Sequence, residues 1–137
     1  MEIILSLPLH SRVWIYQSVR ELSAQEVTDI RANALSFLNQ WTSHGNNMDA
    51  AIDVLYNRFI IVAVDEQTAP ASGCGIDKSV RFIQDIEKQF NTTLLDRMHV
   101  AYKAGDSIQT CSLSEFEKLI NTKQVDENTI VFNNLVS

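Results

Sequence analysis

The spacing of hydrophobic and polar residues changes several times along the chain, and each change marks the start of another helix or strand. Residues 12–17 (RVWIYQ) alternate and are rich in β-branched and aromatic side chains, which predicts a strand. Residues 50–56 and 58–65 predict two further strands with a boundary near Asn57. The second of these is apolar without alternation, which is typical of a central strand covered on both faces.

Apolar residues that recur at helical spacing predict two long helices. The first begins at a capping box, Ser23 to Glu26, and continues to a C-cap at Gly45. The second follows a segment rich in proline and glycine and ends near Asn91. A third, shorter helix is predicted behind another capping box that starts at Ser112.

The remaining patterns complete the predicted fold. Residues 98–103 and 107–111 predict two strands joined by a turn, and residues 129–132 predict a last edge strand. The order is β-α-β-β-α-β followed by β-α-β in a single domain of residues 1–137. The first six elements match the ferredoxin-like pattern, in which two helices cover one face of an antiparallel sheet. We therefore expect an α+β fold with a ferredoxin-like core and a C-terminal β-α-β extension.

Right-handed crossovers in such a fold bring several segments to one end of the sheet. These segments are residues 10–12, the turn at 44–47, Asp65 and the loop 66–75. The sheet face without helices would present either Trp14 and Tyr16 or Val13 and Ile15. Apolar side chains there need cover from the C-terminal elements or from a second subunit, so we expect a homodimer.

The composition limits the classes of function. The chain has 137 residues, of which 45% are hydrophobic and 20% charged, as in a soluble globular protein. Its net charge is −6 and it has no run of Lys or Arg, which argues against nucleic acid or an anionic membrane as a partner. The longest apolar run, residues 59–64, is too short to span a bilayer.

The cysteines indicate a reducing compartment. Residues 1–9 lack the basic start of an export signal, so we expect a cytoplasmic protein with two free thiols, Cys74 and Cys111. Neither cysteine has a second ligand at the spacing of a zinc site. We therefore expect no metal and no cofactor.

Turn-forming residues are scarce, with 4 Gly and 2 Pro, and three of the six lie in the stretch from Pro70 to Gly75. This segment joins the most buried predicted strand to a helix, and its glycines permit positive φ and close approach to a ligand. Residues suited to hold a carboxylate or phosphate gather here: Ser72, Gly73, Gly75, Asp77, Lys78 and Ser79. The alternative is a structural connection in which Cys74 packs as a small hydrophobe and Asp77 caps the helix.

A cysteine at a helix N-terminus favours the nucleophilic thiolate. The predicted topology brings Cys74 to the same sheet end as His44 and Asp65, and these are the parts of a Cys-His-Asp catalytic system. His44 can instead be a favourable charge at a helix C-terminus. Three functions stay open: binding of a small molecule or anion at residues 65–79 and His44, a thiol-dependent enzyme with Cys74 as nucleophile, and a non-catalytic dimeric interaction module.

A third candidate feature is the face shared by Arg12, Trp14 and Tyr16 on the first strand. A cation and two aromatic rings can bind a planar ligand, with Arg12 as a binding residue. The alternative is that the two rings belong to the core or to a dimer surface.

Several pieces of the chain resemble a small family of Bacteroidetes proteins: residues 11–18, 41–45, 58–66, 71–80 and 96–97. Members of this family often carry the label "ABC transporter ATPase". The resemblance covers about residues 10–103 and implies no particular activity. Where the family usually has Ser-Gly-Cys-Ser, this chain has Ser72-Gly-Cys-Gly75. The Walker A pattern GxxxxGK[ST] is absent from the sequence, so we do not expect an ABC ATPase.

Overall fold

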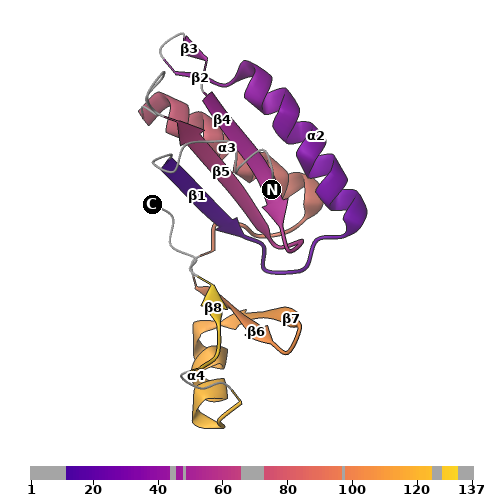
Figure 1. Ribbon diagram of the computed structural model, residues 1–137, viewed down its shortest axis with the longest axis vertical. Helices are drawn as coiled ribbons and strands as arrows, with labels where there is room; N and C mark the ends of the chain where they lie inside the picture. The colour runs from indigo at the N-terminus through magenta and orange to yellow at the C-terminus, as the bar shows by residue number, and fades with distance from the viewer. Residues whose placement is uncertain are drawn as a thin grey trace.

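The computed structural model describes residues 12–43, 46–47, 49–65, 73–96, 98–124 and 128–132. Antiparallel sheets and helices form an α+β fold, as the sequence predicts (Figure 1). In chain order the elements are β1 (Arg12–Gln17), α2 (Ala24–Gln40), β2 (Thr42–Ser43), β3 (Asn46–Asn47), β4 (Asp49–Leu55), β5 (Phe59–Asp65), α3 (Gly73–Phe90), β6 (His99–Ala104), β7 (Ser107–Ser112), α4 (Leu113–Asn121) and β8 (Val131–Phe132).

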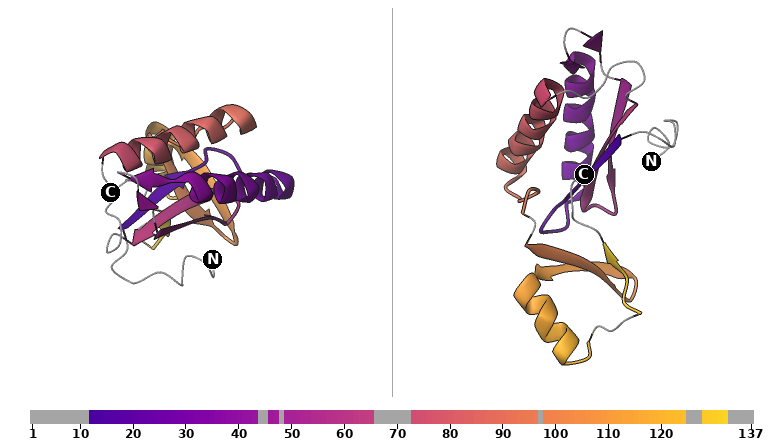
Figure 2. Two further views of the ribbon diagram at one scale, coloured as in Figure 1. Left: turned by 90° about the horizontal axis from the view of Figure 1, so that it is seen from above. Right: turned by 90° about the vertical axis from the view of Figure 1, so that its left-hand side faces the viewer.

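The first sheet has the strand order β1-β5-β4, and both outer strands run antiparallel to β5. All seven residues of β5 are buried, which confirms the predicted central strand. β1 and β4 are consequently parallel to each other and are connected through α2, as in a split βαβ unit. Helices α2 and α3 lie on the same face of this sheet (Figure 2, right).

The fourth strand of a ferredoxin-like sheet is missing from this sheet in the described part of the chain. The strand expected beside β1 is β6, which instead pairs with β7 and β8 in a separate sheet of order β7-β6-β8. The chain leaves α3 across the end of β1, where the Val19 N–H donates to the Thr93 carbonyl at 3.1 Å. After this point β6 joins the second sheet instead of lying along β1, so the complete ferredoxin-like core is not confirmed.

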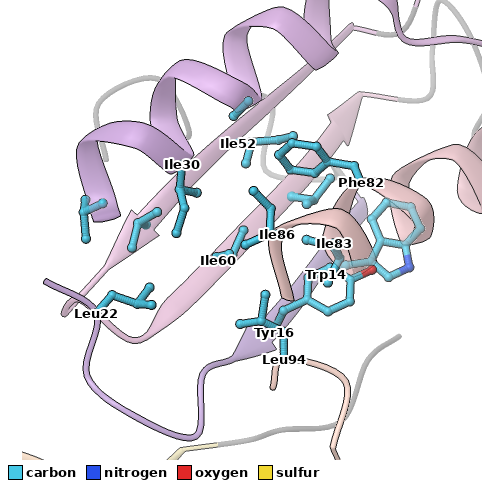
Figure 3. Packing of buried hydrophobic residues seen from close by; sticks show 14 of the residues in the cluster. Trp14, Tyr16, Leu22, Ile30, Ile52, Ile60, Phe82, Ile83, Ile86 and Leu94 are labelled. Atoms are coloured by element: carbon cyan, nitrogen blue, oxygen red, sulfur yellow. The ribbon is translucent and has the colours of Figure 1, made fainter. Parts of the chain in front are cut away.

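The core lies between the helix pair and the first sheet (Figure 3). Trp14 and Tyr16 point from β1 toward the helices and are buried. On the opposite face Val13 is 38% exposed and Ile15 is half-buried. The face that needs cover is therefore the one with Val13 and Ile15, and the homodimer stays a prediction.

Helix α2 ends earlier than its pattern predicts. It stops at Gln40 instead of near Gly45, because Trp41 adopts an extended backbone with φ −74° and ψ 112°. The next residues, Thr42–Ser43, pair with Asn46–Asn47 as a short antiparallel ladder. Trp41 leaves the helix axis at this point and its ring is buried.

The N-terminus of α2 carries the predicted capping box. Ser23 Oγ accepts from the Glu26 N–H at 3.1 Å, and Glu26 Oε1 accepts from the Ser23 N–H at 2.9 Å. The Glu26 carboxylate also accepts two bonds from the Arg20 guanidinium, at 2.8 and 2.7 Å. The Arg20 hydrogen bond, with the cap, lowers the pKa of Glu26 from its ordinary 4.5 to about 2. Arg20 donates in addition to the carbonyl of Phe90, the last residue of α3.

The low pKa of Glu26 predicts a loss of stability in acid. Because the folded-state pKa lies below the ordinary value, the contribution of Glu26 is complete above about pH 4.5 and disappears as the pH falls toward 2. The variant Glu26→Gln retains an acceptor for the cap but has no charge for Arg20. We expect it to be less stable than wild type at neutral pH and to show a smaller loss between these pH values.

Urea unfolding midpoints as a function of pH measure this difference. Glu117→Gln removes an exposed carboxylate from α4 and is the matched control, whose pH profile is expected to follow the wild type. A Glu26→Gln profile parallel to that of wild type contradicts the assignment.

Candidate functional site

Three of the predicted site residues cannot be placed by their side chains. His44 and Ser72 lie outside the described residues, and so does the side chain of Cys74. The backbone of Cys74 lies in the first turn of α3, between Gly73 and Gly75. The Cys-His-Asp arrangement therefore stays a prediction.

The two glycines of this segment do not use the positive φ that the sequence permits. Gly73 and Gly75 both belong to α3, whereas Gly105 is the glycine with positive φ in the described part of the chain. The helix starts at Gly73, four positions before Asp77, so the glycines lie inside its first turn and not in the preceding loop. A Cβ atom on Gly73 would meet nothing within 4 Å.

Trp41 connects the end of α2 to the start of α3. Its indole Nε1 donates a buried hydrogen bond of 2.9 Å to the carbonyl of Gly75. The Trp41 side chain is only 1% exposed. This contact confirms that the end of the first long helix and the start of the second meet at one end of the sheet.

Asp65 lies at that same end but does not face the helices. Asp65 is buried, and in the strand register it lies opposite Asp49 of β4. The preceding residue, Val64, belongs to the core beneath the helices. Because side chains alternate along a strand, Asp65 points to the opposite face of the sheet.

Arg12 is exposed at the start of β1, where it pairs with Val64. Its guanidinium carbon lies 4.7 Å from the centre of the Trp14 ring, which is a cation–π contact. Trp14 and Tyr16 are buried in the core, so the shared face is confirmed and its aromatic rings are structural.

The other predicted binding residues lie on the first turns of α3. Ser79 is buried, and its Oγ donates to the carbonyl of Ile76 at 2.7 Å, so its hydroxyl serves the helix. Asp77 is exposed. Lys78 is half-buried and lines a groove.

This groove, of about 450 Å³, lies between α2 and α3. Its lining comes from the end of α2 and the first half of α3: Ser36, Phe37, Gln40, Trp41, Lys78, Arg81, Phe82 and Asp85. The α3 residues fall at positions i, i+3, i+4 and i+7, which is one helix face. We call this cavity the α2–α3 groove.

Three aromatic rings line the α2–α3 groove. The rings of Phe37 and Phe82 are stacked, with centres 4.7 Å apart and planes at 17°. The ring of Trp41 is tilted against Phe37 at 5.1 Å. The rings come from both helices and pack against each other, so together they form one aromatic wall.

The charges of the α2–α3 groove differ in sign from those of the whole chain. Lys78 and Arg81 bring two positive charges and Asp85 one negative, so the lining has a net charge of 2 − 1 = +1. The protein as a whole has −6. The groove is therefore a local positive site on an acidic protein.

Most of this groove was beyond the sequence-based prediction. Among the predicted site residues that the structure describes, Lys78 is the one that lines it. The signal that was available is a second stripe on α3, at positions 78, 81, 82 and 85, beside the apolar stripe that faces the core. Pairing this stripe with Phe37 and Trp41 required the tertiary structure.

Comparison of the chain with protein-family models, with curated proteins and with solved structures found no match. Among the described residues, no helix has the length and apolar character to cross a membrane. Within the same residues, no group of three or more His, Cys, Asp or Glu side chains is placed to hold a metal ion.

Trp41 provides a test of how the two helices are joined. Trp41→Phe keeps an aromatic ring but loses the buried bond to Gly75 and part of the ring volume, so we expect a loss of roughly 1–3 kcal/mol in the free energy of unfolding. Urea unfolding followed by circular dichroism measures it. Trp14→Phe makes the same change on β1 in the same core, and we expect a smaller loss in the free energy of unfolding. Equal losses for the two variants contradict a special role for the Trp41 bond.

Proposed function

We propose that the protein binds a small planar anion in the α2–α3 groove. The observation that carries the proposal is the combination of an aromatic wall, made by Phe37, Trp41 and Phe82, with the cations Lys78 and Arg81 beside it. Small-molecule sites are commonly apolar and aromatic clefts of about 300–1,000 Å³ with a few polar groups that orient the ligand. The groove has these properties.

Specificity for a planar ligand follows from the rings. Offset stacking on a fixed aromatic wall gives about 0.5–1.5 kcal/mol beyond the burial of area. Phe37 is half-buried and is the ring of the three with the most surface left for a ligand. A flat ligand can lie against it while its polar edge extends toward α3.

Specificity for an anion follows from the charges. Arg81 and Lys78 lie one turn apart on α3, so one carboxylate can receive hydrogen bonds from both. The groove is close to the first turn of α3, where the helix dipole also favours negative charge. This position supports the sequence-based proposal of an anion site around residues 65–79 and His44.

We further propose that residues 12–90 represent a ferredoxin-like unit that lacks its fourth strand. The strand order β1-β5-β4 and the two helices on one face support this assignment. In this unit the α2–α3 groove lies between the two helices, on the outer side of the helix layer.

The charge pattern of the α2–α3 groove predicts opposite effects for two neighbouring substitutions. With naphthalene carboxylate as the probe, we expect Arg81→Gln to weaken binding roughly three- to tenfold, because a charge-assisted hydrogen bond is lost. Asp85→Asn removes the negative charge that repels the carboxylate of the probe, and is expected to tighten binding. Titrations followed by Trp fluorescence measure both affinities.

The neutral carboxamide of naphthalene controls for stacking alone. Its affinity is expected to be the same for wild type, Arg81→Gln and Asp85→Asn. Lys118→Gln, on the exposed surface of α4, controls for net charge. If Lys118→Gln weakens carboxylate binding as much as Arg81→Gln does, the protein has no specific anion site in this groove.

A thiol-dependent enzyme is the competing proposal. The position of Cys74 on the first turn of α3 favours it, because a helix N-terminus lowers the pKa of a thiol. Cys111 is different: burial, with Glu115 nearby, raises the pKa of its thiol. It is a free and buried thiol, which supports the proposed cytoplasmic location.

Alkylation by iodoacetamide tests the enzyme proposal. If Cys74 is an activated nucleophile, it is expected to react at neutral pH about tenfold faster than the same cysteine in urea-unfolded protein. His44→Gln is expected to abolish that excess, and Cys111 is the slow internal reference. Mass spectrometry of the two labelled peptides gives the rates. A Cys74 that reacts no faster when folded excludes the thiol enzyme and leaves the binding proposal intact.

A further inference from the structure

A second cavity, of about 290 Å³, lies between the β4–β5 turn and the β6–β7 hairpin. Figure 1 shows the β4–β5 turn at the end of the first sheet that faces the hairpin. This cavity shares no lining residue with the α2–α3 groove. Its polar and aromatic lining includes Glu21, Tyr56, Arg58, Asp106, Ser107 and Gln109. We call it the hairpin cleft.

Hydrogen bonds hold both walls of the hairpin cleft against the segment between β1 and α2. The Ser18 N–H donates to the carbonyl of Arg58 at 2.7 Å, on one wall. Thr110 Oγ1 donates to the carbonyl of Val19 at 2.7 Å, on the other. The cleft is therefore built into the fold and does not depend on the chance position of two loops.

Arg58 supplies a cation with one unused donor atom. Its side chain lines the cleft, yet its Nη1 is buried and has no hydrogen-bond partner in the described part of the chain. Burial lowers the pKa of Arg58, while the charge of Glu21 raises it. A buried N–H without an acceptor costs about 1–3 kcal/mol, and a ligand oxygen in the cleft can remove that cost.

The two carboxylates of the cleft argue against a purely anionic ligand. Glu21 and Asp106 line the same cavity as Arg58, so the lining has a net charge of 1 − 2 = −1. An anion would gain Arg58 but be repelled by both acids. A ligand with one negative and one positive group can satisfy both signs.

Tyr56 adds an aromatic surface in a strained turn. Tyr56 and Asn57 have φ of 54° and 56° and are the central residues of a turn in which the Arg58 N–H donates to the Leu55 carbonyl at 3.0 Å. Asn tolerates this conformation, but a bulky residue such as Tyr is uncommon there. The Tyr56 side chain is 69% exposed at the mouth of the cleft. The Tyr56 ring contacts Phe59 edge to face, with ring centres 6.3 Å apart. Residues held in such uncommon backbone conformations often lie at binding sites.

We infer that the hairpin cleft binds a free α-amino acid with an aromatic side chain. Arg58 receives the carboxylate, after rotation of its guanidinium toward the ligand, and Glu21 and Asp106 together receive the ammonium group. The aromatic side chain lies against Tyr56. Ser107 and Gln109 provide hydrogen-bonding groups at the rim. This inference does not depend on the function proposed for the α2–α3 groove.

L-Phenylalanine and two analogues with one charge each test the inference. Phenylpropionate lacks the ammonium group and phenethylamine lacks the carboxylate. Backbone amide shifts of isotope-labelled protein, followed by NMR during titration, report both affinity and location. We expect L-phenylalanine to shift residues 56–58 and 106–109, and each analogue to bind at least about tenfold more weakly, because each loses a charge-assisted hydrogen bond.

Two variants assign the charged groups. Arg58→Gln is expected to weaken L-phenylalanine binding at least about tenfold. Asp106 lies on an exposed turn. We expect Asp106→Asn to weaken the binding of L-phenylalanine and to tighten the binding of phenylpropionate. If Arg58→Gln fails to fold, the opposite responses of Asp106→Asn decide the question. Arg81→Gln changes the other cavity and is expected to leave L-phenylalanine binding unchanged.

Three results would overturn the inference. In the first, L-phenylalanine at millimolar concentration shifts none of the cleft residues. In the second, the one-charge analogues bind as tightly as L-phenylalanine. In the third, inorganic phosphate shifts the same amides as strongly, which would make the cleft a simple anion site. None of these results bears on the α2–α3 groove, because that groove is probed with a different ligand and different variants.

Discussion

The burial of β5 on both faces is the constraint from which the arrangement of the N-terminal part follows. Its seven residues are apolar except for Asp65, and all of them are buried between β1 and β4. Covering a large aliphatic side chain contributes roughly 1.5–3 kcal/mol, so a strand of this composition is stable only in the middle of a sheet. With β5 in the middle, β1 and β4 are parallel, and α2 connects them across the face that α3 also covers. The core of Ile30, Ile60 and Ile83 fills the space between these layers (Figure 3).

The two long helices are joined at both ends by polar contacts. At one end Arg20 bridges Glu26, in the first turn of α2, and the carbonyl of Phe90, at the end of α3. At the other end the indole of Trp41 donates to Gly75 in the first turn of α3. The helices therefore run antiparallel and are in contact at both ends. Side chains from both helices can thus form one cavity, the α2–α3 groove.

Local signals in the sequence predicted most elements correctly. The capping residue Ser23 marks the start of α2, and the apolar run of β5 identifies the central strand of the first sheet. The boundary near Asn57 is correct because a tight turn there needs a residue that tolerates positive φ. The end of α2 was predicted too late: Gly45 is a good C-cap, but the helix stops at Gln40 and the Trp41 ring is buried. Gly73 and Gly75 were assigned to a loop before α3 but form its first turn, because a pair of glycines is compatible with either structure.

The sequence by itself determined which segments are helices and strands, which strand is central, and that the start of α3 carries polar groups. These properties depend on hydrophobic period and capping within a few residues. Only the tertiary structure decided that β6 lies in a separate sheet from β1, that Asp65 faces away from the helices, and that Phe37, Trp41 and Arg81 meet in one groove. These features depend on contacts between residues far apart in the chain, such as Val19 with Thr93 and Trp41 with Gly75. No local pattern in the sequence records such contacts.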